Sequence, residues 1–174
     1  MTIDIPSLVV AAGGEIVGKV RLQKVVYLLD QIGLNSGFSY EYFRYGPYSE
    51  DLAERVEDDV IFGHLHADQR RRLSDGVPYI AYSAEAAGDG DTLEAHIPTD
   101  RIQTALAEMQ QRSATVLELA ATIHWLAVME GIPDWKTELF RRKGAKTNND
   151  RDQRAVELLR TLGLPPAVGS AGQV

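Results

Sequence analysis

The chain has 174 residues, of which 44% are hydrophobic and 25% are charged, a balance typical of one globular domain with a core rather than of a disordered chain. It contains no cysteine, which excludes disulfides, thiolate metal sites and a cysteine nucleophile. The net charge of −7 makes indiscriminate binding of the whole surface to a phosphate backbone unfavourable.

Two helices are predicted at the start of the chain. Pro6 suits the first turn of a short helix that ends before Gly13 and Gly14. A second helix is predicted over residues 19–33, because its apolar residues recur at the spacing of one helical face. These residues are Leu22, Val25, Val26, Leu29 and Ile32.

The stretch YEYFRYGPYSEDL, residues 40–52, predicts a strand, a turn and the start of a third helix. Its first half is rich in β-forming aromatic residues. Gly46 and Pro47 favour a turn, since proline cannot donate a hydrogen bond inside a sheet. Ser49 is a suitable N-cap, and the acids that follow it are favoured by the helix dipole. We therefore interpret this stretch mainly as a structural corner.

The remaining chain predicts one hairpin and a set of helices. Asp75 and Gly76 lie between two segments able to pair as strands. Helices are expected over residues 99–112, 113–130, 134–143 and 150–162. The predicted fold class is α+β and mostly α, with a winged-helix-like N-terminal part and an appended C-terminal helical bundle. We expect a single domain over residues 1–163 and a flexible tail over residues 164–174.

The sequence shows no catalytic, cofactor or membrane signature. No nucleophile elbow, paired-carboxylate or metal-ligand pattern is present, so we expect a binding module rather than an enzyme. The longest apolar run, residues 116–129, is too short to span a bilayer and contains Glu118 and His124. With no basic leader at its start, the chain is expected to be cytoplasmic.

Two short sequence patterns resemble ligand-binding motifs but are incomplete. GGEIVGKV, residues 13–20, approaches a phosphate-binding loop, but Val20 stands where that loop needs a hydroxyl. His64 and His66, with Asp68 nearby, have a spacing that could clip a metal ion, but no further cluster completes a site. We expect an interhelical turn and a solvent-facing strand, respectively, and neither a metal nor a cofactor.

Two basic clusters leave nucleic-acid binding open as an alternative. The first is Arg70, Arg71 and Arg72, on the predicted hairpin, and the second is Arg141, Arg142 and Lys143. The helix that would enter a DNA groove begins EDLAERVEDD, and its acids would repel DNA. We therefore do not expect nucleic acid as the partner, although either cluster could contact phosphate or an acidic protein.

RLQKVVYLLDQ, residues 21–31, followed by YGPYSEDL, residues 45–52, resembles the opening signature of the Panacea or SocA-like antitoxin family, especially its YwgA-like members. The resemblance covers about residues 15–163. The matching positions, which the resemblance implies are structural, are Leu22, Gln23, Lys24, Tyr27, Gly46, Pro47 and Ser49. The family implies an α-rich fold with a small β element, no established catalytic centre, and antitoxin action by binding or delivering a protein partner.

We expect a protein-binding module of antitoxin or adaptor type, whose partner is basic and could be a toxin. The acidic helix after Ser49 would attract that partner, and aromatic residues next to it would anchor it. The expected contact residues are Tyr40, Tyr42, Arg44, Tyr48, Glu54, Glu57 and Asp58.

Overall fold

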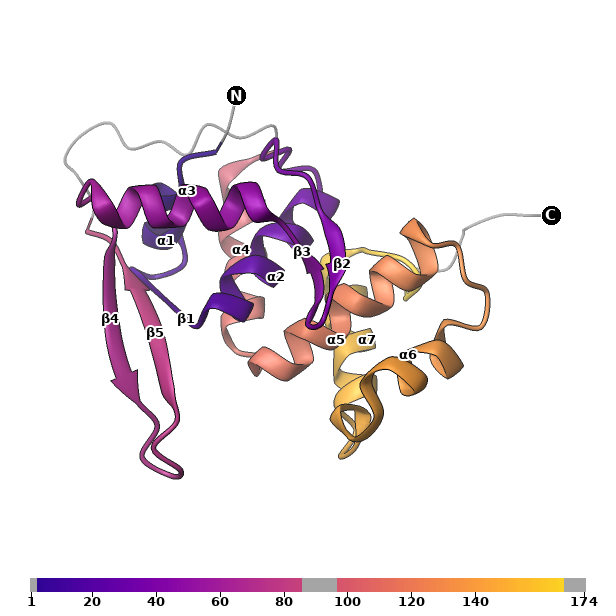
Figure 1. Cartoon of the computed structure of the whole chain (residues 1–174). Helices are drawn as coiled ribbons and strands as arrows, with labels where there is room; N and C mark the ends of the chain where they lie inside the picture. Colours follow the sequence, from indigo (N-terminus) through magenta and orange to yellow (C-terminus); the bar gives the residue numbers. More distant parts are fainter. Residues whose placement is uncertain (1–2, 86–96, 168–174) are drawn as a thin grey trace.

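The computed structural model describes residues 3–85 and 97–167 (Figure 1). In the first range the chain forms α1 (Ile5–Ala11), β1 (Glu15–Val17), α2 (Lys19–Gln31), β2 (Glu41–Phe43), β3 (Gly46–Tyr48), α3 (Glu50–Ile61), β4 (His66–Arg71) and β5 (Pro78–Ser83). The second range forms α4 (Thr99–Gln110), α5 (Ala114–His124), α6 (Trp135–Lys143) and α7 (Arg151–Leu162). A π-helical turn (Trp125–Met129) continues α5, and a 3-10 turn (Gly144–Thr147) follows α6. The protein is mostly helical with little sheet, as the sequence predicts.

Two small antiparallel sheets accompany the helices. In the three-stranded sheet β5 lies between β1 and β4, with Ile16 opposite Tyr82 and Gln69 opposite Ile80. The β4–β5 hairpin projects away from the helices (Figure 1). The second sheet is the short β2–β3 hairpin, which packs against both α2 and α5 through β3.

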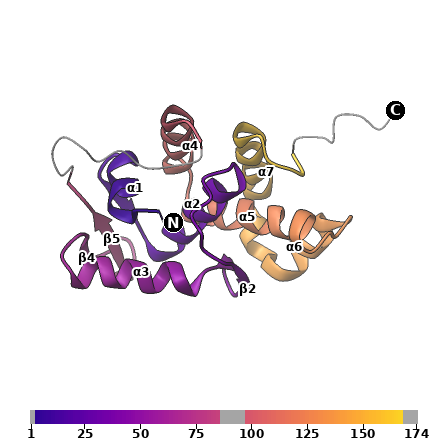
Figure 2. The same ribbon diagram turned by 90° about the horizontal axis from the view of Figure 1, so that it is seen from above.

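Helix α2 forms the centre of the core. Every residue from Leu22 to Leu29 is buried, including Gln23 and Lys24. Helix α5 packs against α2 on one side and α7 on another, while α3 crosses the opposite side of the molecule (Figure 2). Burial of α5 is nearly complete as well, because its residues are apolar almost all round.

The predicted helices are all present, with ends shifted by a few residues, and the hairpin turns where Asp75 and Gly76 stand. Strand β1 differs from the sequence prediction, which is an interhelical turn over residues 13–20. Residues 15–17 form a strand because β5, more than sixty residues away in the sequence, supplies the pairing edge. Leu164, assigned from the sequence to the tail, is buried in the core, and residues 168–174 of that tail lie outside the described residues.

The turn predicted at Gly46 and Pro47 is placed wrongly. The chain reverses at Arg44 and Tyr45, and residues 46–48 form β3, paired with β2. Proline is tolerated there because the sheet has only two strands, so one side of each strand needs no ladder partner. Within the described residues, no helix is long and apolar enough to cross a membrane.

Candidate functional site

Two side chains of α2 hold the segment that leads into α3. The Gln23 amide donates to the carbonyl oxygen of Ser49 (2.8 Å) and accepts from its backbone nitrogen (2.9 Å). The Lys24 ammonium donates to the carbonyl oxygen of Pro47 at 2.5 Å. Ser49 then caps α3 by accepting from the backbone nitrogen of Leu52 (3.2 Å). The contacts of Gln23, Lys24 and Ser49 therefore fix the direction in which α3 leaves the hairpin.

Lys24, one of the positions that the resemblance implies are structural, makes a buried contact with this corner, and its acceptor is a backbone carbonyl oxygen. Its side chain is 1% exposed. Burial lowers the pKa of Lys24 from 10.5 to about 8; the nearby Glu118 charge opposes this shift, whereas Lys143 and Lys146 add to it. The ammonium group therefore belongs to a buried charge cluster as well as to the corner.

Gly46 occupies a position that only glycine fits. Its φ is +88°, and a Cβ atom there would lie 2.6 Å from the hydroxyl oxygen of Thr122 in α5. The hydroxyl is itself fixed, since it donates to the carbonyl oxygen of Glu118 (2.8 Å). The hairpin backbone thus lies directly against α5.

Tyr27 and Tyr40 are packing residues with satisfied hydroxyls. The Tyr27 hydroxyl lies 2.7 Å from Nδ1 of His124, and its ring meets the edge of Tyr40 at a centroid distance of 5.1 Å. The Tyr40 hydroxyl donates to Asp30 (2.8 Å). Burial, followed by the Asp30 charge, raises the pKa of Tyr40. The sequence predicts Tyr40 as a partner contact, whereas the structure places its ring half-buried against Tyr27.

Glu118 of α5 gathers the C-terminal lysines around a buried carboxylate. Lys143 lies 2.8 Å and Lys146 2.9 Å from its oxygens, and Lys143 also donates to the carbonyl oxygen of Arg44 in the hairpin turn (3.1 Å). Glu118 and Lys143 are both buried. This cluster joins α5, α6 and the β2–β3 hairpin.

The second basic cluster is occupied by contacts inside the protein. Arg141 and Arg142 pair with Glu138, and Arg142 also pairs with Glu130. These hydrogen bonds lower the pKa of Glu138 to about 2. The Arg142 guanidinium covers the half-buried Tyr42 ring at 4.6 Å.

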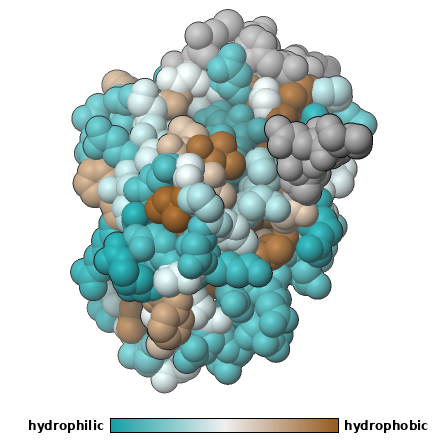
Figure 3. Space-filling model, turned by 90° about the vertical axis from the view of Figure 1, so that its right-hand side faces the viewer, coloured by the Kyte–Doolittle hydropathy of each residue, from teal (hydrophilic) through white to brown (hydrophobic). Residues whose placement is uncertain are grey.

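The side of the molecule that lies at the right of Figure 1 is mainly hydrophilic. Hydrophobic residues form separate small patches on it (Figure 3).

The hairpin arginines are partly neutralised too. Arg70 forms two bonds with Glu15 and one with Asp68. Arg72 pairs with Asp75. Arg71 donates to the carbonyl oxygen of Gly76 and lacks an acidic partner among the residues that the structure describes.

The exposed carboxylates of α3, which we call the acidic ridge, are not paired with basic side chains among the residues that the structure describes. It consists of Glu50, Asp51, Glu54, Glu57 and Asp58. Within residues 3–85 and 97–167, no basic side chain lies within the 4.0 Å ion-pair distance of a ridge carboxylate. Asp59 is separate from the ridge, because it is buried and contacts Arg55 and His64. The helix therefore presents a concentrated negative charge.

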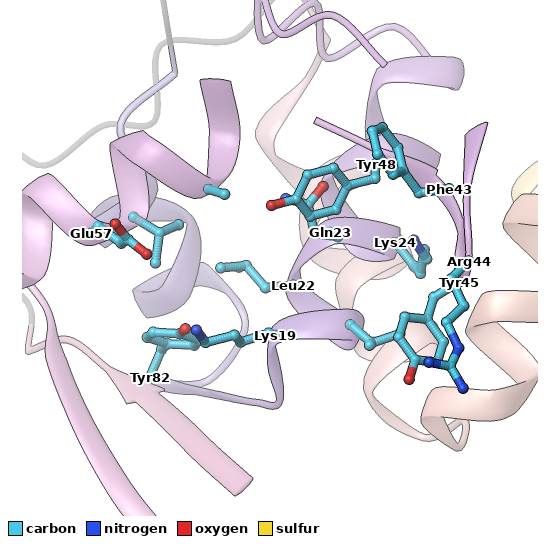
Figure 4. Close-up of a pocket in the computed structure, with 13 residues that line it drawn as sticks. Lys19, Leu22, Gln23, Lys24, Phe43, Arg44, Tyr45, Tyr48, Glu57 and Tyr82 are labelled. Atoms are coloured by element: carbon cyan, nitrogen blue, oxygen red, sulfur yellow. The ribbon is translucent and has the colours of Figure 1, made fainter. Parts of the chain in front are cut away.

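An aromatic groove of about 460 Å³ runs beside this ridge (Figure 4). Its walls are mainly apolar and come from α2, α3, the β2–β3 hairpin and β5. Four aromatic side chains line it: Phe43, Tyr45, Tyr48 and Tyr82. Glu57 is the ridge carboxylate on its wall, whereas Glu54 and Asp58 line a shallower hollow on the other side of α3.

Sequence reasoning missed two exposed aromatic residues of the hairpin. Phe43 is 51% and Tyr45 43% exposed, and both line the groove. They were missed because the sequence predicts one strand that continues to Tyr45, whereas the chain reverses at Arg44 and Tyr45. Of the expected contact residues, Arg44, Tyr48 and Glu57 line this groove.

The two sequence patterns that resemble ligand-binding motifs have ordinary structural explanations. Residues 15–17, between the glycines of GGEIVGKV, form β1 instead of a phosphate-cradling loop. His64 contacts Asp59 (3.3 Å), and His66 lies on the exposed strand β4. Across the described ranges, no group of three or more histidine or acidic residues could hold a metal ion.

Comparison with known proteins finds two relatives, while no family model matches the chain. The chain is similar to the uncharacterized protein YwgA of Bacillus subtilis, with 28% identity over 142 residues, covering 80% of this chain and 84% of YwgA. It is also similar to a DNA ADP-ribosyl glycohydrolase of Thermus aquaticus, with 30% identity over 128 residues. That match covers 70% of this chain and 34% of the relative, so the chain spans about a third of the enzyme's length.

Proposed function

We propose that this protein is a non-enzymatic binding module that recruits a basic protein partner through the acidic ridge. The observation that carries the proposal is the set of five exposed α3 carboxylates, next to an apolar groove, that form no ion pair with any residue of the described ranges. Charge of one sign at the rim speeds association with a partner of the opposite sign, and apolar contacts then hold the complex.

The placement of the positive charges supports the same proposal. The C-terminal basic segment could have folded onto α3, but it pairs instead with Glu118, Glu130 and Glu138. The ridge therefore remains open to a partner. Burying several like charges without compensation would be costly, so that partner must bring cations to the interface.

The arrangement of the N-terminal helices and strands also indicates which class of partner suits α3. The order α1, β1, α2, α3, β4, β5, with β5 between β1 and β4, supports a winged-helix-like arrangement with the β2–β3 hairpin inserted. In that arrangement α3 takes the place of the helix that reads DNA. Because α3 carries the acidic ridge and most hairpin arginines are already paired, a basic protein suits this surface better than nucleic acid.

The partial match to the glycohydrolase supports an accessory role. The match to the glycohydrolase covers only part of that enzyme, as expected if this kind of domain can accompany a separate catalytic part. The Panacea-like antitoxin role that the opening motifs imply belongs to this proposal, with a toxin as one possible basic partner. Delivery of a partner to another protein is the adaptor form of the same function.

The test is capture from the source organism followed by reconstitution. Wild-type protein and the triple variant Glu54→Lys, Glu57→Lys, Asp58→Lys are immobilised, and captured proteins are identified and purified. We expect a basic protein that binds the wild type, binds more weakly as salt rises, and loses roughly tenfold or more of its affinity for the variant.

A matched control separates local charge from net charge. The triple variant Asp100→Lys, Glu108→Lys, Glu157→Lys makes the same change of net charge on α4 and α7. It should bind the partner nearly as well as the wild type. Equal affinity for wild type and ridge variant, or retardation of ordinary duplex DNA by the wild type at physiological salt, would refute the proposal.

A further inference from the structure

The aromatic groove has the form of a site for an inserted side chain. Its volume of about 460 Å³ lies within the roughly 300–1,000 Å³ of small-ligand sites. Buried Leu22 of α2 and Val56 of α3 contribute to its apolar lining. The aromatic side chains stand around Leu22 (Figure 4). Strong interface contacts commonly consist of one large side chain buried in such a pocket.

Charged side chains of both signs line the groove. Glu57 lies on the α3 side, close enough to Tyr48 and Tyr82 that its charge contributes to raising the pKa of both hydroxyls after burial. Lys19 and Arg44 line the groove from α2 and from the hairpin turn. The Lys24 ammonium is already used by Pro47. An occupant therefore meets a carboxylate at Glu57 and hydrogen-bond donors at Lys19 and Arg44 along the groove.

We infer that the groove binds a short peptide segment of the partner that carries a large aromatic or aliphatic side chain flanked by lysine or arginine. The large side chain fills the space between Tyr45, Tyr48 and Tyr82. The flanking cation meets Glu57 and the rest of the acidic ridge. Peptide carbonyl oxygens face Lys19 and Arg44, whose donors satisfy them. This inference rests on the proposed function and specifies where the partner is anchored.

Three synthetic peptides test the groove without the natural partner. Ac-Lys-Trp-Lys-NH₂ carries both required features, Ac-Glu-Trp-Glu-NH₂ reverses the charge, and Ac-Lys-Gly-Lys-NH₂ lacks the anchor. Each is titrated into ¹⁵N-labelled protein at constant ionic strength. We expect saturable shifts of the amide signals of Ala53, Glu57 and Tyr82 with the first peptide, and roughly tenfold or more weaker binding of the other two.

Variants of the groove complete the experiment. Ala53→Trp should fill the groove and abolish binding of the first peptide, and Val20→Phe provides a second block if Ala53→Trp does not fold. Glu57→Gln should weaken binding severalfold, whereas the control Glu108→Gln on α4 should not. Absence of saturable shifts, indifference to a folded blocking variant, or equal binding of the three peptides would overturn the inference.

The remaining outcomes distinguish this inference from the proposed function. If the ridge variant loses the natural partner while Ala53→Trp retains it, the proposed function stands and the groove proposal is wrong. If the protein dimerises and Ala53→Trp makes it monomeric, a second copy fills the groove, which also refutes the proposal. If peptide binding is found but the ridge variant keeps its partner, the proposed function is the part that fails.

Discussion

At the residue scale, Lys24 illustrates how a buried charge can have a structural role. Its ammonium group donates to the carbonyl oxygen of Pro47 in β3, and the whole side chain is buried with its neighbours on α2. Such a contact is costly to remove, because the carbonyl then remains buried without a partner. The lowered pKa shows that burial of the charge has its own cost.

We predict that Lys24→Ala lowers the free energy of unfolding by roughly 1–3 kcal/mol at pH 7. Lys24→Met, which keeps the stem, should lose less. Lys19→Ala, on the exposed side of the same helix, is the control and should stay within about 0.5 kcal/mol of the wild type. Urea denaturation measures all three, and a Lys24→Ala variant as stable as the wild type would contradict the assigned role.

His124 makes stability depend on pH. Burial lowers the pKa of His124 from 6.5 to about 4, so between these values the unfolded chain binds a proton that the folded protein excludes. The free energy of unfolding must therefore fall as the pH is lowered through this interval. From pH 7 to pH 4.5 the expected loss from this residue is roughly 2–3 kcal/mol.

The pH prediction is checked against His124→Asn, whose amide can still pair with the Tyr27 hydroxyl but does not titrate. The wild type should lose more stability than His124→Asn over the same pH interval, as measured by urea denaturation at both pH values. Parallel losses in the two proteins would mean that His124 is protonated in the folded state at its ordinary pKa.

At the element scale, the β2–β3 hairpin depends on its close approach to α5 at Gly46. Gly46→Ala should destabilise the fold by roughly 2–4 kcal/mol, because the positive φ and the contact with Thr122 both oppose a Cβ atom. In a Thr122→Ala background the contact is removed, and the cost should fall to roughly 1–2 kcal/mol.

Gly131 supplies the matched control for this prediction. Its φ of +64° is also positive, but a Cβ atom there would meet nothing within 4 Å. Gly131→Ala should therefore show the backbone cost alone. If Gly46→Ala unfolds at the same denaturant concentration as Gly131→Ala, the close approach to α5 does not contribute to the free energy of unfolding.

The elements also show what sequence patterns can and cannot predict. The helices follow from apolar periodicity, and the start of α3 follows from Ser49, because both signals are local. Strand β1 and the reversal at Arg44 were missed, since each depends on a pairing partner rather than on its own residues. The groove was missed for the same reason: Phe43, Tyr48 and Tyr82 come together only in the folded chain.

At the scale of the whole molecule, positive and negative charges are arranged unequally. The carboxylates near the C-terminal cations are paired, which leaves the acidic ridge as the concentrated uncompensated charge among the residues described. The buried carboxylate at Glu118 could not be anticipated, because its lysine partners come from α6 and from the turn after it. Because the acidic ridge lies apart from the C-terminal cations, we expect its charge to act on the rate at which a partner associates.

Ridge charges and groove side chains should affect different rate constants. Charges at a rim act while the partner is still distant, whereas a buried aromatic contact acts only after docking. With the purified partner, Glu54→Lys and Asp58→Lys should therefore lower the association rate by roughly tenfold at low salt, and the effect should shrink as salt screens the charges. Tyr48→Ala should mainly raise the dissociation rate, and Glu157→Lys, outside the ridge, should change neither. Surface plasmon resonance at several salt concentrations resolves the two rates; ridge reversals that act only on dissociation, or that are insensitive to salt, would show that the ridge does not steer the partner.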